Sequence, residues 1–224
     1  MLLVTSAVGF APRVTSIRSS RQGENCAVFF PGGSAFIHHD IYRSFLSKLV
    51  SEGTDVYIPP FQYADTAALV SELRERYENV AAVAHSSGAT VALNKCGGSD
   101  VKFVLLDPVN TRIGNLSQPF HISDNTPAVL FLHAMKSFQM NQNPAGLPFI
   151  PFRSLRIRPA SLPPTTVVRT IDSAEHGHSD ILDHLFADFM HNSRISVGTL
   201  HRDTLEEYHL WLAKTIHTFI SEES

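Results

Sequence analysis

The stretch N-V-A-A-V-A-H-S-S-G-A-T, residues 79–90, decides the fold. Its apolar part, residues 80–84, predicts a strand buried on both faces, and the residues that follow Gly88 favour a helix. A polar corner with Ser86 at its apex joins the two. The letters A-H-S-S-G approximate G-x-S-x-G, the pattern of a nucleophile elbow, whose small residues let strand and helix approach closely. A serine- and glycine-rich loop at a strand end is the alternative, so the remaining chain must decide.

Strand and helix patterns alternate along the whole chain. Strands are expected at residues 26–30, 55–58, 80–84, 102–106, 127–132 and 165–171, and helices at 41–49, 67–77, about 88–95, 182–190 and 199–220. Such alternation predicts an α/β architecture, with a mainly parallel sheet and helices on both of its faces. A chain of 224 residues is long enough to bury a substantial core in one domain of this kind.

Composition excludes several classes of protein. A net charge of −3 provides no basic field, so nucleic acid is not expected as a partner. Cys26 and Cys96 are too few for a disulfide framework or a zinc site. His38, His39 and His133 show no metal-ligand spacing, and we expect neither a metal nor an organic cofactor. No apolar run reaches the roughly 18 residues that span a bilayer.

The first 24 residues differ in composition from the rest. They are rich in arginine and serine, and no acidic residue occurs before Glu24, which is typical of an organellar transit segment. Residues 6–12, S-A-V-G-F-A-P, also resemble the A-S-A-F-A-P plastid-import motif of algae with secondary plastids, with Phe10 at the motif's phenylalanine. A frayed polar terminus is the alternative. We therefore expect a targeting or disordered leader at residues 1–24 and a folded domain at residues 25–224.

The interval 133–164 fits no regular element. It combines several prolines and asparagines with aromatic residues. A structureless segment of this length inside a compact domain is typical of a lid, a binding loop or disorder, and the aromatic residues argue against disorder. We expect a lid-like insertion in which Phe138, Phe149 and Phe152 bind an apolar substrate. A loop that packs its own aromatic residues onto the core is the alternative.

A nucleophilic serine needs a base and an acid. Its hydroxyl reacts poorly at neutral pH unless a base within hydrogen-bond reach, itself oriented by an acid, removes the proton. In parallel sheets such groups gather at the carboxyl ends of strands. Asp107 directly follows one buried strand, and the last strand leads into His176 and His178. Gly177 lets the backbone bend so that His178 projects toward the serine, which favours it over His176. The chain order serine, acid, histidine is then satisfied.

The acid is expected one strand earlier than usual. The usual acid follows the next-to-last strand, but after residues 127–132 no acid occurs until Asp172. Asp107 is therefore the better candidate. Glu175, Asp180 and Asp183 are interpreted as helix N-terminal or solvated charges.

An oxyanion hole requires backbone N–H groups near the developing negative charge. Ser87, the residue after the expected nucleophile, can supply one at the start of a helix. The glycine pair that follows the first core strand can supply the second, from Gly33, because small residues let the backbone approach a substrate closely.

Several short motifs in order resemble one family. Residues 84–89, 105–109 and 176–184 read A-H-S-S-G-A, L-L-D-P-V and H-G-H-S-D-I-L-D-H. They are similar to G-H-S-R-G-G, G-I-D-P-V and Y-G-H-M-D-M-L-D-D of the chlorophyllases, α/β-hydrolases that cleave the phytyl ester of chlorophyll. Residues 30–33 and 41–46, F-P-G-G and I-Y-R-S-F-L, resemble the family's H-G-[FY] and F-Y-x-x-L. The resemblance covers residues 26–184.

The resemblance implies an α/β-hydrolase fold with a loop-rich lid. It also implies that a triad of Ser86, Asp107 and His178 cleaves chlorophyll to chlorophyllide and phytol, without a cofactor. A hydrophobic ester such as chlorophyll would be the substrate, and an algal plastid the location.

Departures from the family pattern leave alternatives open. Pro31 replaces the histidine of H-G, and Ser87 and Ala89 replace arginine and glycine beside the nucleophile. A hydrolase of another lipid or of a small ester is one alternative. A non-catalytic pigment- or lipid-binding protein with the same fold is another. Peripheral association with a membrane and the oligomeric state are also left open.

Overall fold

The computed structural model describes residues 3–4, 14–19, 23–32, 38–60, 65–109, 112–113, 116–117, 122, 124, 126–136, 157, 162, 166–192 and 201–222. Four predicted site residues, Gly33, Phe138, Phe149 and Phe152, lie outside the described residues. So do residues 6–12 and most of the interval 133–164, whose role as a lid therefore stays a prediction.

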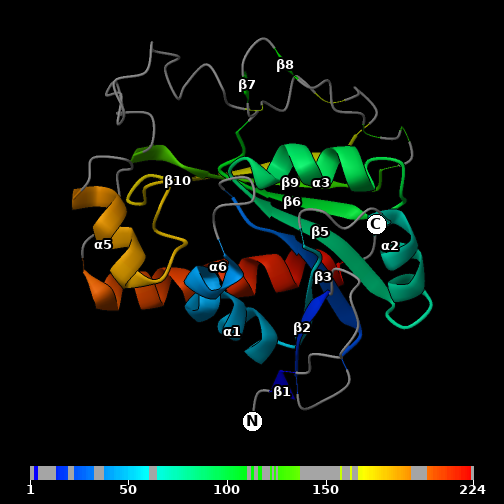
Figure 1. Cartoon of the computed structure of the whole chain (residues 1–224), viewed down its shortest axis with the longest axis horizontal. Helices are drawn as coiled ribbons and strands as arrows, with labels where there is room; N and C mark the ends of the chain where they lie inside the picture. The colour runs from blue at the N-terminus through cyan, green and yellow to red at the C-terminus, as the bar shows by residue number, and fades with distance from the viewer. Residues whose placement is uncertain are drawn as a thin grey trace.

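An eight-stranded sheet forms the centre of the protein, in the order β1-β2-β4-β3-β5-β6-β9-β10 (Figure 1). These strands are β1 (Leu3–Val4), β2 (Thr15–Arg18), β3 (Asn25–Phe30), β4 (Thr54–Ile58), β5 (Asn79–His85), β6 (Lys102–Leu106), β9 (Val129–Ala134) and β10 (Val168–Ser173). All neighbours from β4 to β10 are parallel, whereas β2 pairs antiparallel with both β1 and β4. The mainly parallel sheet is thus confirmed. A separate hairpin pairs β7 (Arg112–Ile113) with β8 (Leu116–Ser117).

Residues 15–18 belong to the sheet rather than to a leader. Ile17 of β2 pairs with Val56 of β4 and packs against the core. The backbone N–H of Ser19 donates to Asp55 at 2.7 Å. The domain boundary expected at residue 24 is therefore wrong for this segment. A strand of only four residues, T-S-I-R, has too few apolar positions to form a recognisable run.

Helices cover both faces of the sheet, as expected (Figure 1). On one face, α1 (Arg43–Ser51) and α6 (Arg202–Ser221) pack together, and on the other lie α2 (Thr66–Arg74) and α3 (Gly88–Cys96). A 3-10 helix, η1 (His39–Tyr42), precedes α1, and α5 (His184–Asn192) follows the turn after β10. Within the described residues no helix is both long enough and apolar enough to cross a membrane.

The two faces explain why the central strands are mostly apolar. In β3, Ala27 and Phe29 face the α1–α6 core, while Cys26, Val28 and Phe30 face the α2–α3 core. Alternate side chains of a strand point to opposite faces, so a strand covered on both sides is apolar at most of its positions.

The turn from β5 into α3 depends on a glycine. A Cβ atom on Gly88 would lie 2.3 Å from the backbone oxygen of Phe30 and 2.6 Å from that of Pro31. The first turn of α3 therefore rests directly on the backbone at the end of β3. This contact is the physical reason for the second small residue in the G-x-S-x-G pattern. It also places Ser86 at the carboxyl edge of the sheet, between β5 and α3.

Candidate active site

The carboxyl ends of three strands bring Ser86, Asp107 and His178 together. The Nε2 atom of His178 lies 2.9 Å from Ser86 Oγ, and its Nδ1 atom lies 2.7 Å from Asp107 Oδ2. The side chain of Asp107 is only 5% exposed and that of His178 is 11% exposed. An imidazole held in this way donates its Nδ1 hydrogen to the carboxylate and leaves Nε2 as an acceptor for the serine proton.

Two of these residues have strained backbones. Ser86 has a φ of 53° and Asp107 a φ of 39°. Both values lie in the left-handed region, which residues other than glycine seldom adopt. Hydrogen bonds to the backbone of neighbouring strands hold both residues in this conformation. The N–H of Ser86 donates to Leu106 at 3.0 Å, and the N–H of Asp107 donates to Leu132 at 2.7 Å. Strain of this kind costs about 1–3 kcal/mol per residue and concentrates at functional sites.

His176 is directed elsewhere. Its ring stacks on Tyr208 with a centroid distance of 3.7 Å, and its Nδ1 atom lies 2.5 Å from Ser173 Oγ. Of the two histidines that the sequence left in competition, only His178 contacts the serine and the aspartate. Asp172, the first acid after β9, lies exposed on the edge strand β10.

Of the two residues expected to form the oxyanion hole, Ser87 lies within the described part of the chain and Gly33 does not. Ser87 occupies the N-cap position of α3, where the helix dipole favours negative charge. Gly33 lies outside the described residues, but its neighbour Gly32 shows how closely this loop approaches. A Cβ atom on Gly32 would lie 2.9 Å from Ser86 Cβ. The loop after β3 thus contacts the proposed nucleophile.

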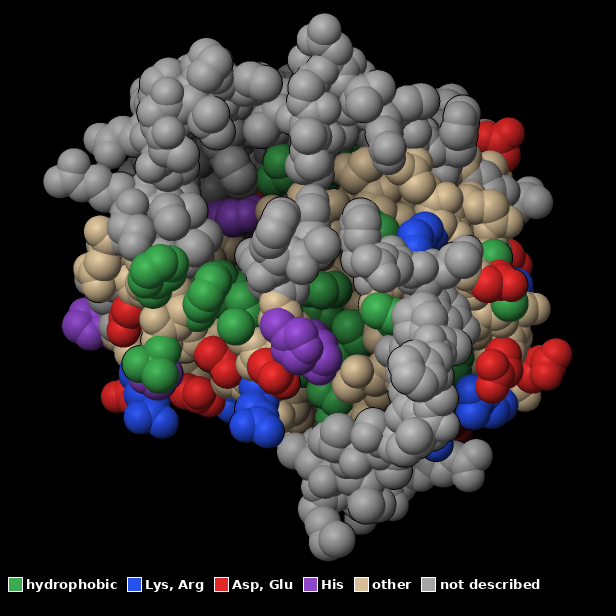
Figure 2. Space-filling view, viewed as in Figure 1, with side chains coloured by type: hydrophobic (Ala, Val, Ile, Leu, Met, Phe, Trp, Pro, Cys, Tyr) green, Lys and Arg blue, Asp and Glu red, His purple; other side chains and the backbone are tan. Residues whose placement is uncertain are grey.

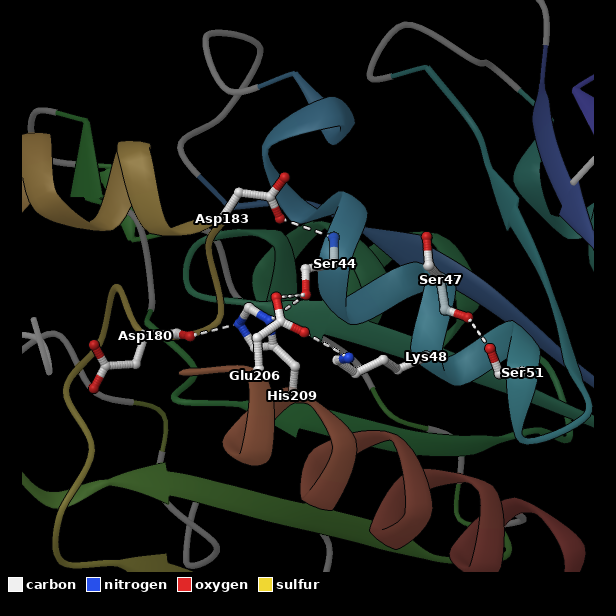
Figure 3. A network of polar contacts seen from close by, with 8 residues as sticks. All are labelled: Ser44, Ser47, Lys48, Ser51, Asp180, Asp183, Glu206 and His209. Carbon is white, nitrogen blue, oxygen red and sulfur yellow. Dashed lines mark hydrogen bonds and ion pairs between the residues drawn. The ribbon is translucent and has the colours of Figure 1, made fainter. Parts of the chain in front are cut away.

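A buried carboxylate, that of Asp180, stabilises the turn that carries His178. Asp180 is completely buried and accepts the N–H of Gly177 at 2.7 Å, so its interpretation as a solvated or helix N-terminal charge was wrong. Asp183 does have a helix N-terminal role, but at α1: its carboxylate accepts the N–H of Ser44 at 2.8 Å (Figure 3). Glu175 is exposed, as expected.

A polar network joins this turn to α1 and α6 (Figure 3). His209 of α6 lies 2.7 Å from the backbone oxygen of Asp180 through Nε2 and 2.9 Å from Ser44 Oγ through Nδ1. Glu206 forms an ion pair with Lys48 at 2.6 Å. The same carboxylate accepts the hydroxyl of Ser44 at 3.1 Å. The position of His178 therefore depends on contacts with two helices that are distant in sequence.

Acid should destabilise the fold through two buried histidines. Burial lowers the pKa of His209 to about 4 and that of His85 to about 3, from the usual 6.5. Between those values and pH 6.5 the folded state binds fewer protons than the unfolded state. Their stabilising effect is therefore complete above pH 6.5 and is lost as the pH falls toward 4. Each histidine should lower the free energy of unfolding by up to about 1.4 kcal/mol per pH unit.

Urea unfolding between about pH 7 and pH 5 measures this effect. The variant His209→Gln keeps a donor for Asp180 but removes one titrating group. We expect its free energy of unfolding to fall less steeply with acid than that of the parent protein. Equal slopes in the two proteins would contradict the assignment to His209.

A histidine pair precedes α1 at the start of η1. The ligand atoms of His38, His39 and Asp40 all lie within 4.8 Å of one another, and His38 Nδ1 is 3.1 Å from Asp40 Oδ2. The two imidazole rings lie side by side, with centroids 4.1 Å apart. The side chains of His38 and Asp40 are exposed, and clusters of this kind are common without an ion, so the expectation that the protein needs no metal stays a prediction.

Exposed hydrophobic side chains lie on α5, the helix that follows the turn of His178. Leu185 is 74% exposed and Phe189 is 55% exposed. Figure 2 shows hydrophobic side chains at the surface in the region where Figure 1 places α5. The sequence alone does not mark them as binding residues, because an i, i+4 apolar pair on a helix is also the pattern of a core-facing stripe.

Solved structures share this architecture. An α/β hydrolase, MGS-M1, from a deep-sea metagenome library of the Medee basin matches with a TM-score of 0.60 and 13% identity, over 97% of this chain and 98% of that one. A putative esterase from Staphylococcus aureus matches with a TM-score of 0.57 and 11% identity, over 99% and 84%. Est1E from Butyrivibrio proteoclasticus matches with a TM-score of 0.56 and 9% identity, over 97% and 99%.

These likenesses, together with the sheet topology, show that the chain has the α/β-hydrolase fold. The fold class expected from the sequence is confirmed. No protein-family model matches the sequence, and no curated protein is similar to it.

Proposed function

We propose that this protein is a serine hydrolase of carboxylic esters. The observation that carries the proposal is the hydrogen-bonded chain from Ser86 through His178 to Asp107. The serine stands on a strained turn at the edge of the sheet, where its hydroxyl meets a base that an acid already orients. Two of the similar solved structures are named as an esterase or a hydrolase, which supports the same reaction class.

The reaction would proceed in two halves. His178 Nε2 takes the proton from Ser86 Oγ, which attacks the ester carbonyl and forms a tetrahedral intermediate. Backbone N–H groups of Ser87 and of the loop after β3 would stabilise its oxyanion. His178 then returns the proton to the departing alcohol and leaves an acyl-enzyme. Water, deprotonated by the same imidazole, attacks the acyl carbonyl, and the imidazole gives that proton to Ser86 Oγ as the acid departs. Asp107 stabilises the imidazolium in both halves.

The substrate class we propose is an ester with a large apolar group, with the phytyl ester of chlorophyll as the leading case. The sequence resemblance to chlorophyllases supports it. The exposed Leu185 and Phe189 also support it, because they offer apolar surface on α5, the helix that follows the turn of His178 in the chain. The plastid location stays a prediction from residues 1–24.

A covalent probe tests the reaction class. A fluorophosphonate should label the folded protein once, at Ser86, and should not label protein unfolded in urea, because only an activated serine reacts. A folded protein that stays unlabelled and cleaves no ester would instead be a binding protein on this fold, which would overturn the proposal.

Product analysis tests the substrate class. The purified protein is incubated with chlorophyll in detergent and, separately, with ethyl and long-chain alkyl esters of one acid. We expect chlorophyllide to form and the long-chain esters to react with the higher kcat/KM. Faster turnover of the ethyl ester, without chlorophyllide, would indicate a hydrolase of small esters.

A further inference from the structure

His85, the residue before the nucleophile, links the two loops that flank Ser86. We propose that His85 is a positioning residue, which holds the turn of His178 and Gly32, just after β3, in place around Ser86. This inference rests on the proposed function and extends it to a residue outside the triad. It follows from a buried chain of hydrogen bonds that begins in one loop and ends in the other.

The direction of each hydrogen bond can be worked out from the donors. The N–H of Gly32 lies 3.0 Å from the hydroxyl oxygen of Tyr42 and can only donate, so this oxygen accepts. The hydroxyl hydrogen of Tyr42 is then directed to His85 Nδ1, 2.9 Å away. With Nδ1 as the acceptor, the hydrogen of the neutral ring is on Nε2. It is donated to the backbone oxygen of His178, 3.0 Å away.

Burial keeps this chain in one arrangement. Tyr42 is completely buried and His85 is 3% exposed, so water does not compete for their hydrogen bonds. Burial, with a further contribution from His178, lowers the pKa of His85 to about 3. The ring is therefore neutral at the pH values at which ester hydrolysis is measured, and Nδ1 remains an acceptor.

The contacts of His85 are with groups that must be placed closely. Its ring lies over that of His178, with centroids 4.7 Å apart. The position that a Cβ atom on Gly32 would take is 3.1 Å from His85 Nδ1 and 2.9 Å from Ser86 Cβ. One imidazole thus lies beside the base and is linked through Tyr42 to Gly32, the neighbour of the residue expected to bind the oxyanion. A displacement of about 1 Å in such groups can cost about 100-fold in rate.

If His85 only filled space in the core, its shape would matter but its polar atoms would not. A positioning role requires the polar atoms, so variants that remove them test it. The variant His85→Leu removes both hydrogen bonds, whereas His85→Gln keeps one donor and one acceptor. Tyr42→Phe keeps the ring and removes only the relay hydroxyl. We expect kcat for a p-nitrophenyl ester to fall about 10–100-fold in His85→Leu and about tenfold in Tyr42→Phe, with KM changed less than about threefold.

Coupling between the two residues is the decisive measurement. Because both act through one chain, the double variant should lose little more than His85→Leu alone, whereas independent effects would multiply. His85→Gln should recover part of the lost kcat. The rate of fluorophosphonate labelling should follow kcat across the series. Melting temperatures identify which variants are folded, and if His85→Leu is not, Tyr42→Phe decides the matter because it leaves the core volume unchanged.

Two outcomes would overturn the inference in distinguishable ways. If the parent protein is labelled and active, and folded Tyr42→Phe and His85→Leu turn over at its rate or show multiplying losses, the positioning role is wrong and the proposed function stands. If the parent protein is neither labelled nor active on any ester, the proposed function fails, and the inference fails with it.

Discussion

Replacing Ser86 by alanine should abolish ester cleavage, with kcat falling by about 10⁴-fold or more. Every step of the proposed reaction begins or ends at Ser86 Oγ, and His178 Nε2 lies 2.9 Å from it. Without that oxygen the imidazole has no group to deprotonate, and no acyl-enzyme can form. Residual turnover would come only from binding and from backbone N–H groups that stabilise an oxyanion after direct attack by water.

The fold should survive this change. Ser86 has a strained φ of 53° and already carries a Cβ atom. Alanine keeps that atom and adds none, so the turn meets no new steric conflict. A melting temperature within a few degrees of the parent value would show this. The exposed Ser51, whose hydroxyl donates to the backbone oxygen of Ser47 in its own helix, offers a matched control. Ser51→Ala should keep full activity and full labelling. Full activity in folded Ser86→Ala would refute the nucleophile and with it the triad.

The central strands could be predicted because their environment is uniform. β3, β5 and β6 are buried on both faces, and an apolar run is the direct consequence. The same reasoning fails at the edges. β10 is an edge strand whose residues alternate between partial burial and exposure, and the prediction began it at Thr165, three residues early. β2 is shorter still and lies in a segment whose composition is typical of a leader.

The candidate triad could also be located from the sequence, because its members stand at strand ends. The register of a parallel sheet brings such ends to one edge whatever lies between them. The residues that hold the triad in place could not be predicted from the sequence. Asp180 lies in a polar stretch that resembles a solvated turn, and only the structure shows its carboxylate buried against the N–H of Gly177. The contact of Tyr42 with His85 joins residues 43 positions apart, for which no local pattern exists.

The acid of the triad gives the second large effect. Replacing Asp107 by asparagine should lower kcat by about 10³–10⁴-fold. The carboxylate accepts the Nδ1 hydrogen of His178 at 2.7 Å and so keeps Nε2 free to take the serine proton. An amide can instead present its N–H₂ group to Nδ1. The imidazole hydrogen then moves to Nε2, and the ring can no longer act as the base.

Asparagine is also the substitution that leaves the backbone least disturbed at this position. The φ of Asp107 is 39°, and asparagine is, with aspartate, among the residues that adopt the left-handed region most readily. The matched control is Asp172→Asn, a change of the same chemistry on the exposed edge strand β10. It should alter kcat less than about twofold, because surface substitutions away from a site have small effects. If Asp172→Asn lost as much activity as folded Asp107→Asn, the acid could not be the residue after β6. Selective loss in Asp107→Asn would place the orienting acid one strand earlier than is usual in this fold, where its amide is held by the end of β9.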